Sequence, residues 1–155
     1  MDFDFELKSL SAQFYIDFPH REFPEILYKD ARPYNCIVFE TNYDYFVCVP
    51  FRTEMGHKNG YHFKNSNRSK LHSSGIDYSK MVIIKDLKYF EPFVGIVDKD
   101  EYNEMVIHIQ KIMLDVHKYL NDFINHHNGT HILESAVYRR KYQYSSLQYF
   151  IQDIV

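Results

Sequence analysis

The sequence predicts one α+β domain, in which helices pack on a compact, strongly twisted antiparallel sheet. Runs rich in β-branched and aromatic residues dominate as far as about residue 97, and apolar residues at three- and four-residue spacing dominate after it. The chain has 155 residues, of which 45% are hydrophobic, so it is long enough to bury a real core. With no linker or internal repeat visible, we expect residues 1–155 to form a single domain.

The N-terminal third predicts a hairpin. The stretch FELKSLSAQFYIDF favours a strand or a strand followed by a turn, and the proline-punctuated PHREFPEILYKDARP is expected to be irregular. Two β-rich runs, Cys36–Glu40 and Tyr45–Val49, then flank TNYD, which supplies the Asn and Asp typical of a turn. Pro50 is expected to end the second strand.

The middle of the chain predicts a long loop between strands. Residues 52–75 contain three glycines and no sustained apolar period, so we expect loop with one short strand at Tyr61–Phe63. The run MVII, from Met81, predicts a buried strand, and FVGIV predicts a second strand or an extended segment.

The last third predicts helices. Asp98 is the expected N-cap of a long amphipathic helix that ends at Asn128–Gly129, about 28 residues by its apolar spacing. A shorter helix is expected from His131, and a final helical turn or two capped by Ser145 or Ser146. The long helix is indicated by apolar residues on one face: Tyr102, Met105, Val106, Ile109, Ile112, Met113, Val116, Leu120 and Phe123.

The chain lacks the sequence features of export and membrane insertion. No apolar run approaches the roughly 20 residues of a membrane span, and the acidic start MDFDFELKSL has no signal-like apolar region. Cys36 and Cys48 lie in separate apolar runs and are expected to be reduced, buried thiols. These features predict a cytoplasmic protein.

Charge is distributed unevenly along the chain, which has a formal net charge of −3. Residues 1–50 carry 4 basic and 9 acidic side chains, whereas residues 51–86 carry 7 basic and 3 acidic ones. The overall charge argues against non-specific polyanion binding, and the middle segment indicates a local anion site. An ordinary solvated loop is the alternative.

Metal and nucleophile chemistry find little support in the sequence. Recognised zinc spacings are absent despite nine histidines, and His108 and His117 are expected to be surface or packing residues of the long helix. There is no G-x-S-x-G motif, phosphate-binding P-loop or G-x-G-x-x-G motif. We therefore expect no metal and no cofactor.

The remaining chemistry is that of a cationic, hydroxyl-rich loop. Arg52, Thr53, His57 and Lys58 follow a predicted strand and are expected to converge on one phosphate. In RNA the 2′-hydroxyl is an internal nucleophile, so cleavage needs only proton transfer and donors for the developing charge. The loop therefore predicts phosphoryl transfer without metal.

The order of four short pieces resembles the toxin endoribonucleases of type III toxin–antitoxin systems, the ToxN, AbiQ and CptN group. The resemblance runs from about Phe5 to Phe93, and the helical third matches only in general character. The pieces are SAQFYIDF, ARPYNCIVFE, YFVCVPFRTEMGHKNGYHF and SGIDYSKMVIIKDLKYFEP.

This resemblance implies an active loop in which Pro50 ends a strand and Thr53 and Lys58 follow, with Arg32 and Tyr15 as further site residues. It also implies an SH3-like β-barrel similar to the MazF/Kid toxins, with added helices. The implied activity is metal-independent RNA cleavage, and the implied partner is a small, repeated, pseudoknotted RNA antitoxin that inhibits the protein.

We therefore expect a cytoplasmic endoribonuclease toxin that leaves a 2′,3′-cyclic phosphate. Lys58 and His57 are the candidates for proton transfer and charge stabilisation, and Thr53 is expected to donate to the scissile phosphate. The remaining candidates are expected to contact RNA: Arg52 and Arg32 through phosphates, Tyr61 and Tyr15 by positioning, and Lys64, Arg68, Lys70, Ser79 and Lys80 as further contacts.

Purely structural roles are the alternative for several of these residues. Arg52 can pair with Glu54, Tyr61 and Phe63 can face the core, and DYSK can be a turn that precedes the Met81 strand. Two other functions also remain open. One is an RNA-binding module that leaves RNA intact, and the other is a protein-interaction or immunity protein that works through its acidic N-terminal third.

Overall fold

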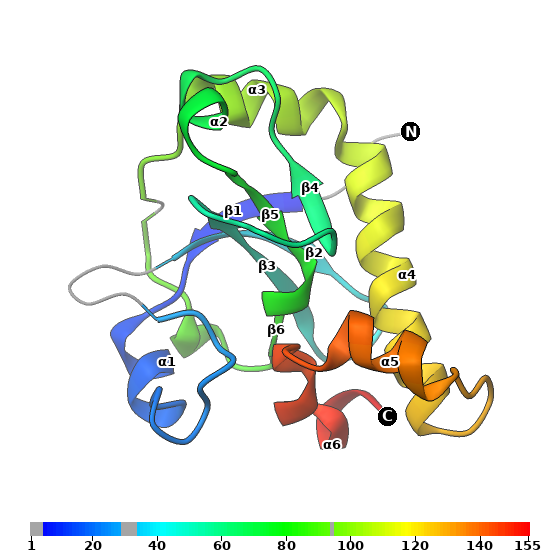
Figure 1. Cartoon of the computed structure of the whole chain (residues 1–155). Helices are drawn as coiled ribbons and strands as arrows, with labels where there is room; N and C mark the ends of the chain where they lie inside the picture. The colour runs from blue at the N-terminus through cyan, green and yellow to red at the C-terminus, as the bar shows by residue number, and fades with distance from the viewer. Residues whose placement is uncertain (1–4, 29–33, 94) are drawn as a thin grey trace.

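The computed structural model describes residues 5–28, 34–93 and 95–155. Its strands form one six-stranded antiparallel sheet surrounded by helices, which confirms the α+β class (Figure 1). The sheet is not closed into a barrel, because the strands at the two ends of its path, β1 and β4, do not pair with each other. The strands are β1 (Phe5–Ser9), β2 (Asn35–Glu40), β3 (Phe46–Arg52), β4 (Gly60–His62), β5 (Gly75–Asp77) and β6 (Val82–Ile84).

The predicted hairpin is confirmed as β2 and β3, which pair from Glu40 opposite Phe46 to Cys36 opposite Pro50. Its turn is held by the Thr41 hydroxyl, which donates to the Tyr45 carbonyl at 2.6 Å. Both strands are buried along most of their length, so apolar side chains stabilise them from both faces.

Strand β3 changes partner along its length. Phe46–Cys48 pair with β6, whereas Phe51 and Arg52 pair with β5. The expectation that Pro50 ends this strand is wrong, because β3 continues to Arg52. Pro50 lies between the stretch of β3 that pairs with β6 and the stretch that pairs with β5. Its missing N–H therefore removes no hydrogen bond to either strand. This continuation carries Arg52 to the end of the sheet.

The predicted loop between β3 and β6 contains more regular structure than expected. The short strand near Tyr61 is confirmed as β4, which pairs with β5. Gly60 and Gly75 have no room for a side chain, because backbone of the paired strand and Met55 crowd each site. Helix α2 (Asn67–Leu71) was not predicted; Ser66 caps it by accepting from the Ser69 N–H. FVGIV forms no strand in its described residues.

The N-terminal stretch contains a helix that was also missed, α1 (Ala12–Asp17), capped by Ser11. The helix is too short for its apolar spacing to form a recognisable period. Phe14 is fully buried and stacks on Phe18 at 4.8 Å between ring centroids.

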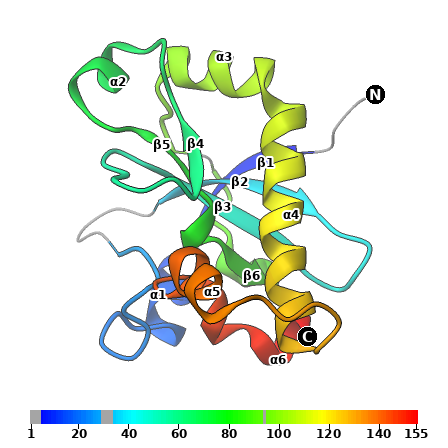
Figure 2. The same cartoon turned by 45° about the vertical axis from the view of Figure 1, so that its right-hand side comes forward.

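The long helix is broken. Helix α3 (Lys99–Ile107) begins at Asp98, which caps it as predicted by accepting from the Glu101 N–H. His108 leaves helical geometry, with φ −105° and ψ 17°, and helix α4 (Ile109–His127) then runs in another direction (Figures 1 and 2). His108 therefore lies at a junction and not inside a helix, while His117 is exposed on α4.

The C-terminal segment follows the expected order. Helix α4 ends at His127, and Gly129 adopts φ +80° just beyond it, a left-handed conformation that favours glycine. Helix α5 (Ser135–Tyr142) begins later than His131, because residues 132–134 adopt no regular structure. Ser145 caps the 3₁₀ turn η3 (Ser146–Tyr149), which precedes α6 (Ile151–Ile154).

One continuous core joins the sheet to the helices. Ile112, Val116 and Phe123 of α4 are buried with the apolar residues of β2 and β3. Cys36 and Cys48 are buried free thiols, as predicted, and burial raises the pKa of Cys36 to about 12. Among the described residues, no helix combines the length and apolar character needed to cross a bilayer.

Candidate functional site

A buried carboxylate organises the end of β3. Asp77, the last residue of β5, has no exposed surface, and its Oδ2 contacts Arg52 Nη1 at 2.9 Å and His57 Nε2 at 3.0 Å. Its Oδ1 accepts from the Ser79 hydroxyl at 2.6 Å and from the Ser79 N–H at 3.0 Å. We name these four residues, Arg52, His57, Asp77 and Ser79, the Asp77 cluster.

The partners of Asp77 keep it ionised. Burial alone would raise the pKa of this carboxyl, but the hydrogen bonds from His57, Ser79 and Arg52 hold its pKa below the ordinary value. A buried anion with this many donors fixes the direction in which the Arg52 guanidinium points. Arg52 thus pairs with Asp77, and the alternative pairing with Glu54 does not form.

His57 is held through both ring nitrogens. Its Nδ1 accepts from the Asn59 N–H at 3.0 Å, so the proton of the neutral ring lies on Nε2 and points to Asp77. The Ser79 hydroxyl oxygen lies 3.4 Å from the same Nε2. In this arrangement the ring has no free lone pair with which to accept a proton from a substrate.

A second pair lies beside this cluster. Arg68, from α2, donates through Nη2 to Thr53 Oγ1 at 2.6 Å, while its Nη1 lies 3.5 Å from Glu101 Oε1. Because the Thr53 oxygen accepts from Arg68, its own hydroxyl hydrogen is available to a bound ligand. Thr53 and Arg68 are 15 residues apart, so the loop folds back on itself to make this contact.

Arg52, Thr53 and Arg68 line one cleft of about 570 Å³, which we name the basic cleft. The charged side chains of its lining are Arg52, Arg68 and Glu101, so the lining has a formal charge of +1. Asp77, outside the lining but 2.9 Å from Arg52, balances this charge, so the cleft offers a phosphate oriented donors and no excess of positive charge. The other lining residues are Ser9, Tyr34, Asn35, Phe51, Phe93, Gly95 and Ile96.

The predicted lysines lie outside this cleft. Lys58, Lys64 and Lys70 are exposed, and none of them forms an ion pair with another described residue. The structure therefore brings Arg52, Thr53 and Arg68 together but does not bring Lys58 into the same lining. Arg32 lies outside the described residues.

Two further RNA candidates, Tyr61 and Lys80, are occupied by internal contacts. Tyr61 is buried and its hydroxyl donates to Glu104 at 2.7 Å, so the geometry favours the packing interpretation over base stacking. The Lys80 ammonium contacts Glu25 at 3.0 Å and the Tyr144 carbonyl at 2.7 Å. It therefore links an N-terminal segment to a C-terminal one.

The DYSK segment forms a turn before the Met81 strand, as the structural alternative expected. Tyr78–Lys80 form the 3₁₀ turn η1, which Asp77 caps and which leads into β6. Ser79 is buried in this turn. Tyr15 is partly buried and accepts from the Tyr34 N–H at 3.4 Å, and burial is the main cause that raises its pKa.

Two carboxylates of α3 that were not predicted as site residues hold the loop. Glu101 accepts from the Ser66 and Ser74 hydroxyls, and Glu104 accepts from the N–H groups of Lys64 and Asn65. Burial opposes ionisation of Glu104, but the hydrogen bonds from Tyr61, Lys64 and Asn65 lower its pKa. Their signal in the sequence was two acids on the buried face of a helix, at the spacing otherwise taken by apolar residues.

No group of three or more His, Cys, Asp or Glu side chains is placed to hold a metal ion in the part of the chain that the structure describes. Comparison with known proteins adds no further constraint on the site: no family model, curated protein or solved structure matches this chain.

Proposed function

We propose that this chain is a metal-independent endoribonuclease, the toxin of a type III toxin–antitoxin system, and that it binds the scissile phosphate in the basic cleft. The observation that carries the proposal is the convergence of Arg52, Thr53 and Arg68 on one cleft, with Arg52 oriented by the buried Asp77. Two guanidinium groups and a hydroxyl supply donors for the non-bridging oxygens of a phosphate.

The proposed reaction is an internal transesterification. The RNA 2′-oxygen forms a bond to phosphorus as the bond from phosphorus to the 5′-oxygen breaks, which gives a 2′,3′-cyclic phosphate and a 5′-hydroxyl. One proton passes from the 2′-hydroxyl to solvent water, and another passes from the Lys58 ammonium to the departing 5′-oxygen. Arg52, Arg68 and Thr53 stabilise the extra negative charge that develops on the phosphate between these events.

Proton transfer is assigned to Lys58 in this proposal. His57 is bound at Nδ1 by Asn59 and at Nε2 by Asp77, so it positions Asp77 and Arg52 and does not itself exchange protons in this arrangement. The Lys58 ammonium is exposed, forms no ion pair with a described residue, and lies only five residues beyond Thr53 in the sequence. The proposal requires this flexible side chain to reach the substrate from outside the cleft when RNA is bound.

A folded, repeated RNA antitoxin is the proposed inhibitor. Lys64 and Lys70 are exposed on the same loop and are proposed to contact its phosphates beyond the cleft. A cytoplasmic location and a relationship to the SH3-like MazF/Kid fold belong to the same proposal. The pairing of β3 with three neighbouring strands, β2, β5 and β6, supports that relationship. The sheet itself is open.

A non-catalytic RNA-binding module is the second candidate, and a specific observation favours it. Within the basic cleft the described residues supply donors for a phosphate, but the carboxylate of the lining, Glu101, is buried and already accepts from Ser66 and Ser74 and pairs with Arg68. It is therefore poorly placed to accept the 2′-hydroxyl proton. In that case the same residues would bind RNA and leave it intact.

Incubation of the purified protein with end-labelled RNA in EDTA separates these candidates. The proposal expects discrete fragments with 2′,3′-cyclic phosphate and 5′-hydroxyl ends, and a large loss of cleavage in Thr53→Val. Arg139→Ala, which removes an exposed cation on α5, is the matched control. Intact RNA that still binds would favour the non-catalytic module, and cleavage that requires added Mg²⁺ would contradict the proposed mechanism.

A further inference from the structure

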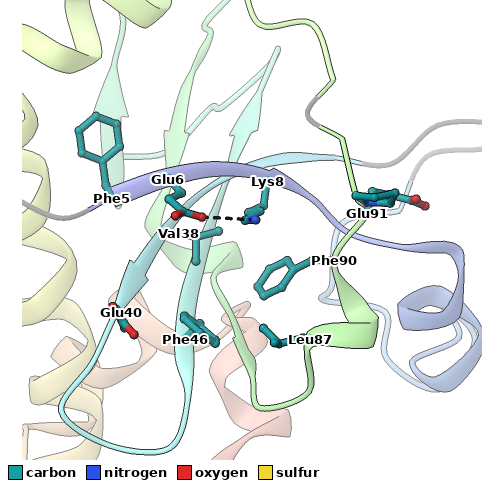
Figure 3. A pocket seen from close by; sticks show the side chains of 10 residues that line it. Phe5, Glu6, Lys8, Val38, Glu40, Phe46, Leu87, Phe90 and Glu91 are labelled. Atoms are coloured by element: carbon teal, nitrogen blue, oxygen red, sulfur yellow. Dashed lines mark ion pairs between the residues drawn. The ribbon is translucent and has the colours of Figure 1, made fainter.

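A second hollow lies on the sheet beside β1, and it shares no lining residue with the basic cleft. It has a volume of about 600 Å³, and we name it the acidic groove. Figure 3 shows its side chains, which come from β1, β2, β3 and the segment that contains the 3₁₀ turn η2 (Leu87–Tyr89). They are Phe5, Glu6, Lys8, Val38, Glu40, Phe46, Leu87, Phe90, Glu91 and Pro92.

The centre of the acidic groove is apolar. Val38, Phe46, Leu87 and Phe90 gather beneath β1 in Figure 3, and the rings of Phe46 and Phe90 meet edge to face at 5.8 Å. Leu87 is 68% exposed, so part of this apolar surface is open to water. Apolar surface of this kind favours a ligand that covers it.

The rim of the acidic groove is negative. Glu6, Glu40 and Glu91 line it together with a single cation, Lys8, which lies 3.3 Å from Glu6. The lining therefore has a formal charge of −2, and neither Glu40 nor Glu91 forms an ion pair with another described residue. A ligand that fits this rim carries positive charge.

The outer edge of β1 offers backbone hydrogen-bonding groups. The Ser9 carbonyl accepts from the Glu91 N–H at 2.8 Å, and the Ser11 N–H donates to the Tyr89 carbonyl at 2.7 Å. The backbone N–H and C=O groups of odd-numbered residues here therefore point away from β2. By the two-residue alternation of a strand, the N–H and C=O of Leu7 face the same way. They have no backbone partner among the described residues.

We propose that an extended peptide, carrying basic and apolar side chains at alternate groove-facing positions, binds here as an added strand on β1. The peptide backbone would continue the pairing that residues 89–91 begin, and every second side chain would enter the acidic groove. Apolar side chains would cover Phe46 and Phe90, and basic ones would pair with Glu40 and Glu91. The site is independent of the proposed nuclease.

A second copy of this chain is a poorer occupant of the same edge. Pairing β1 with β1 would bring together two grooves, each with a formal charge of −2. Like charges brought into one interface oppose association. The charge pattern thus selects a partner that is basic where this chain is acidic.

The test uses the labelled heptapeptide TKTFTKT, titrated against the full chain and followed by fluorescence anisotropy at low salt. We expect saturable binding, and affinity at least about tenfold weaker for the double variant Glu40→Lys with Glu91→Lys. Glu22→Lys, which changes an exposed acid outside the groove, is the matched control and should bind as wild type does. Thr53→Val should also bind normally, which separates this site from the nuclease.

Changes in the peptide test the added strand without disturbing the protein. Methylation of alternate backbone nitrogens should abolish binding in one of its two registers and spare it in the other, because only one set of N–H groups faces β1. Equal binding of TETFTET, no saturable binding of TKTFTKT, or insensitivity to both methylation registers would overturn the proposal. A dimer in sedimentation that the double variant abolishes would assign the edge to a second copy instead.

Discussion

The basic cleft and the acidic groove differ in how their charges are held. In the cleft, Arg52 is fixed by the buried Asp77, and Arg68 is fixed between Thr53 and Glu101. In the groove, Glu40 and Glu91 are without ion-pair partners among the described residues.

This contrast indicates different uses of charge. Fixed donors are suited to a small anionic group whose geometry matters, because their orientation is set before the ligand arrives. Open carboxylates around an apolar floor are suited to an adaptable cationic partner. The first arrangement fits chemistry or tight phosphate recognition, and the second fits docking.

The largest expected effect is on RNA cleavage. Lys58→Ala should lower the single-turnover cleavage rate by roughly 100- to 10,000-fold, because the loss of a proton-transfer group typically has this effect. The double groove variant Glu40→Lys with Glu91→Lys should cleave RNA at the wild-type rate, and melting temperatures should show that both proteins are folded. Wild-type cleavage by Lys58→Ala would remove Lys58 from the mechanism.

The next effect is on stability. Asp77→Ala should lower the free energy of unfolding by about 3 kcal/mol, because it leaves Arg52, His57 and Ser79 without their shared buried partner. Asp44→Ala removes an exposed carboxylate 3.7 Å from Lys85 and should change the free energy of unfolding by less than about 0.5 kcal/mol. Urea denaturation measures both. Equal effects would mean that the Asp77 cluster does not organise the cleft.

The pH dependence follows from the lowered pKa of Asp77. Since the folded protein holds this carboxyl less protonated than the unfolded chain does, its contribution to stability is complete above the ordinary pKa of 3.8 and is lost as the pH falls through the lower folded value. The melting temperature should therefore fall less steeply below about pH 4 in Asp77→Asn than in wild type. Parallel curves would contradict an ionised, hydrogen-bonded Asp77.

The smallest expected effect concerns salt. Arg68→Gln removes one phosphate contact, so the slope of the logarithm of RNA affinity against the logarithm of salt concentration should fall by about 0.7 for a single-stranded ligand. Arg139→Ala should leave the slope unchanged. An unchanged slope in Arg68→Gln would mean that Arg68 serves only Thr53 and Glu101 and does not meet RNA.

Local patterns predicted local structure well. The β2–β3 hairpin, the Asp98 cap and the helix end before Gly129 each depend on neighbouring residues, and the structure confirms them. The break at His108 could not be predicted, because α3 and α4 each bury one face and the apolar spacing runs on through the change of direction.

The site required contacts that no local pattern encodes. Arg52 and Thr53 were expected to meet a phosphate, but their partners Asp77 and Arg68 come from β5 and α2, which the return of the loop brings to β3. Asp77 is one of only three acids in residues 51–86, and the scarcity of acids there was the available signal. Pairing over 25 residues depends on tertiary structure, as does the burial that makes the carboxylate an organising group.

Chemical-shift mapping with a short RNA, made uncleavable by 2′-deoxy substitution at the scissile position, tests whether RNA binds in the basic cleft. We expect saturable shifts at Arg52, Thr53, Arg68 and Gly95, which line the cleft, and none at Val38 and Leu87 in the acidic groove. Shifts confined to the groove, or spread over the surface without saturation, would contradict RNA binding in the basic cleft and with it the proposed nuclease.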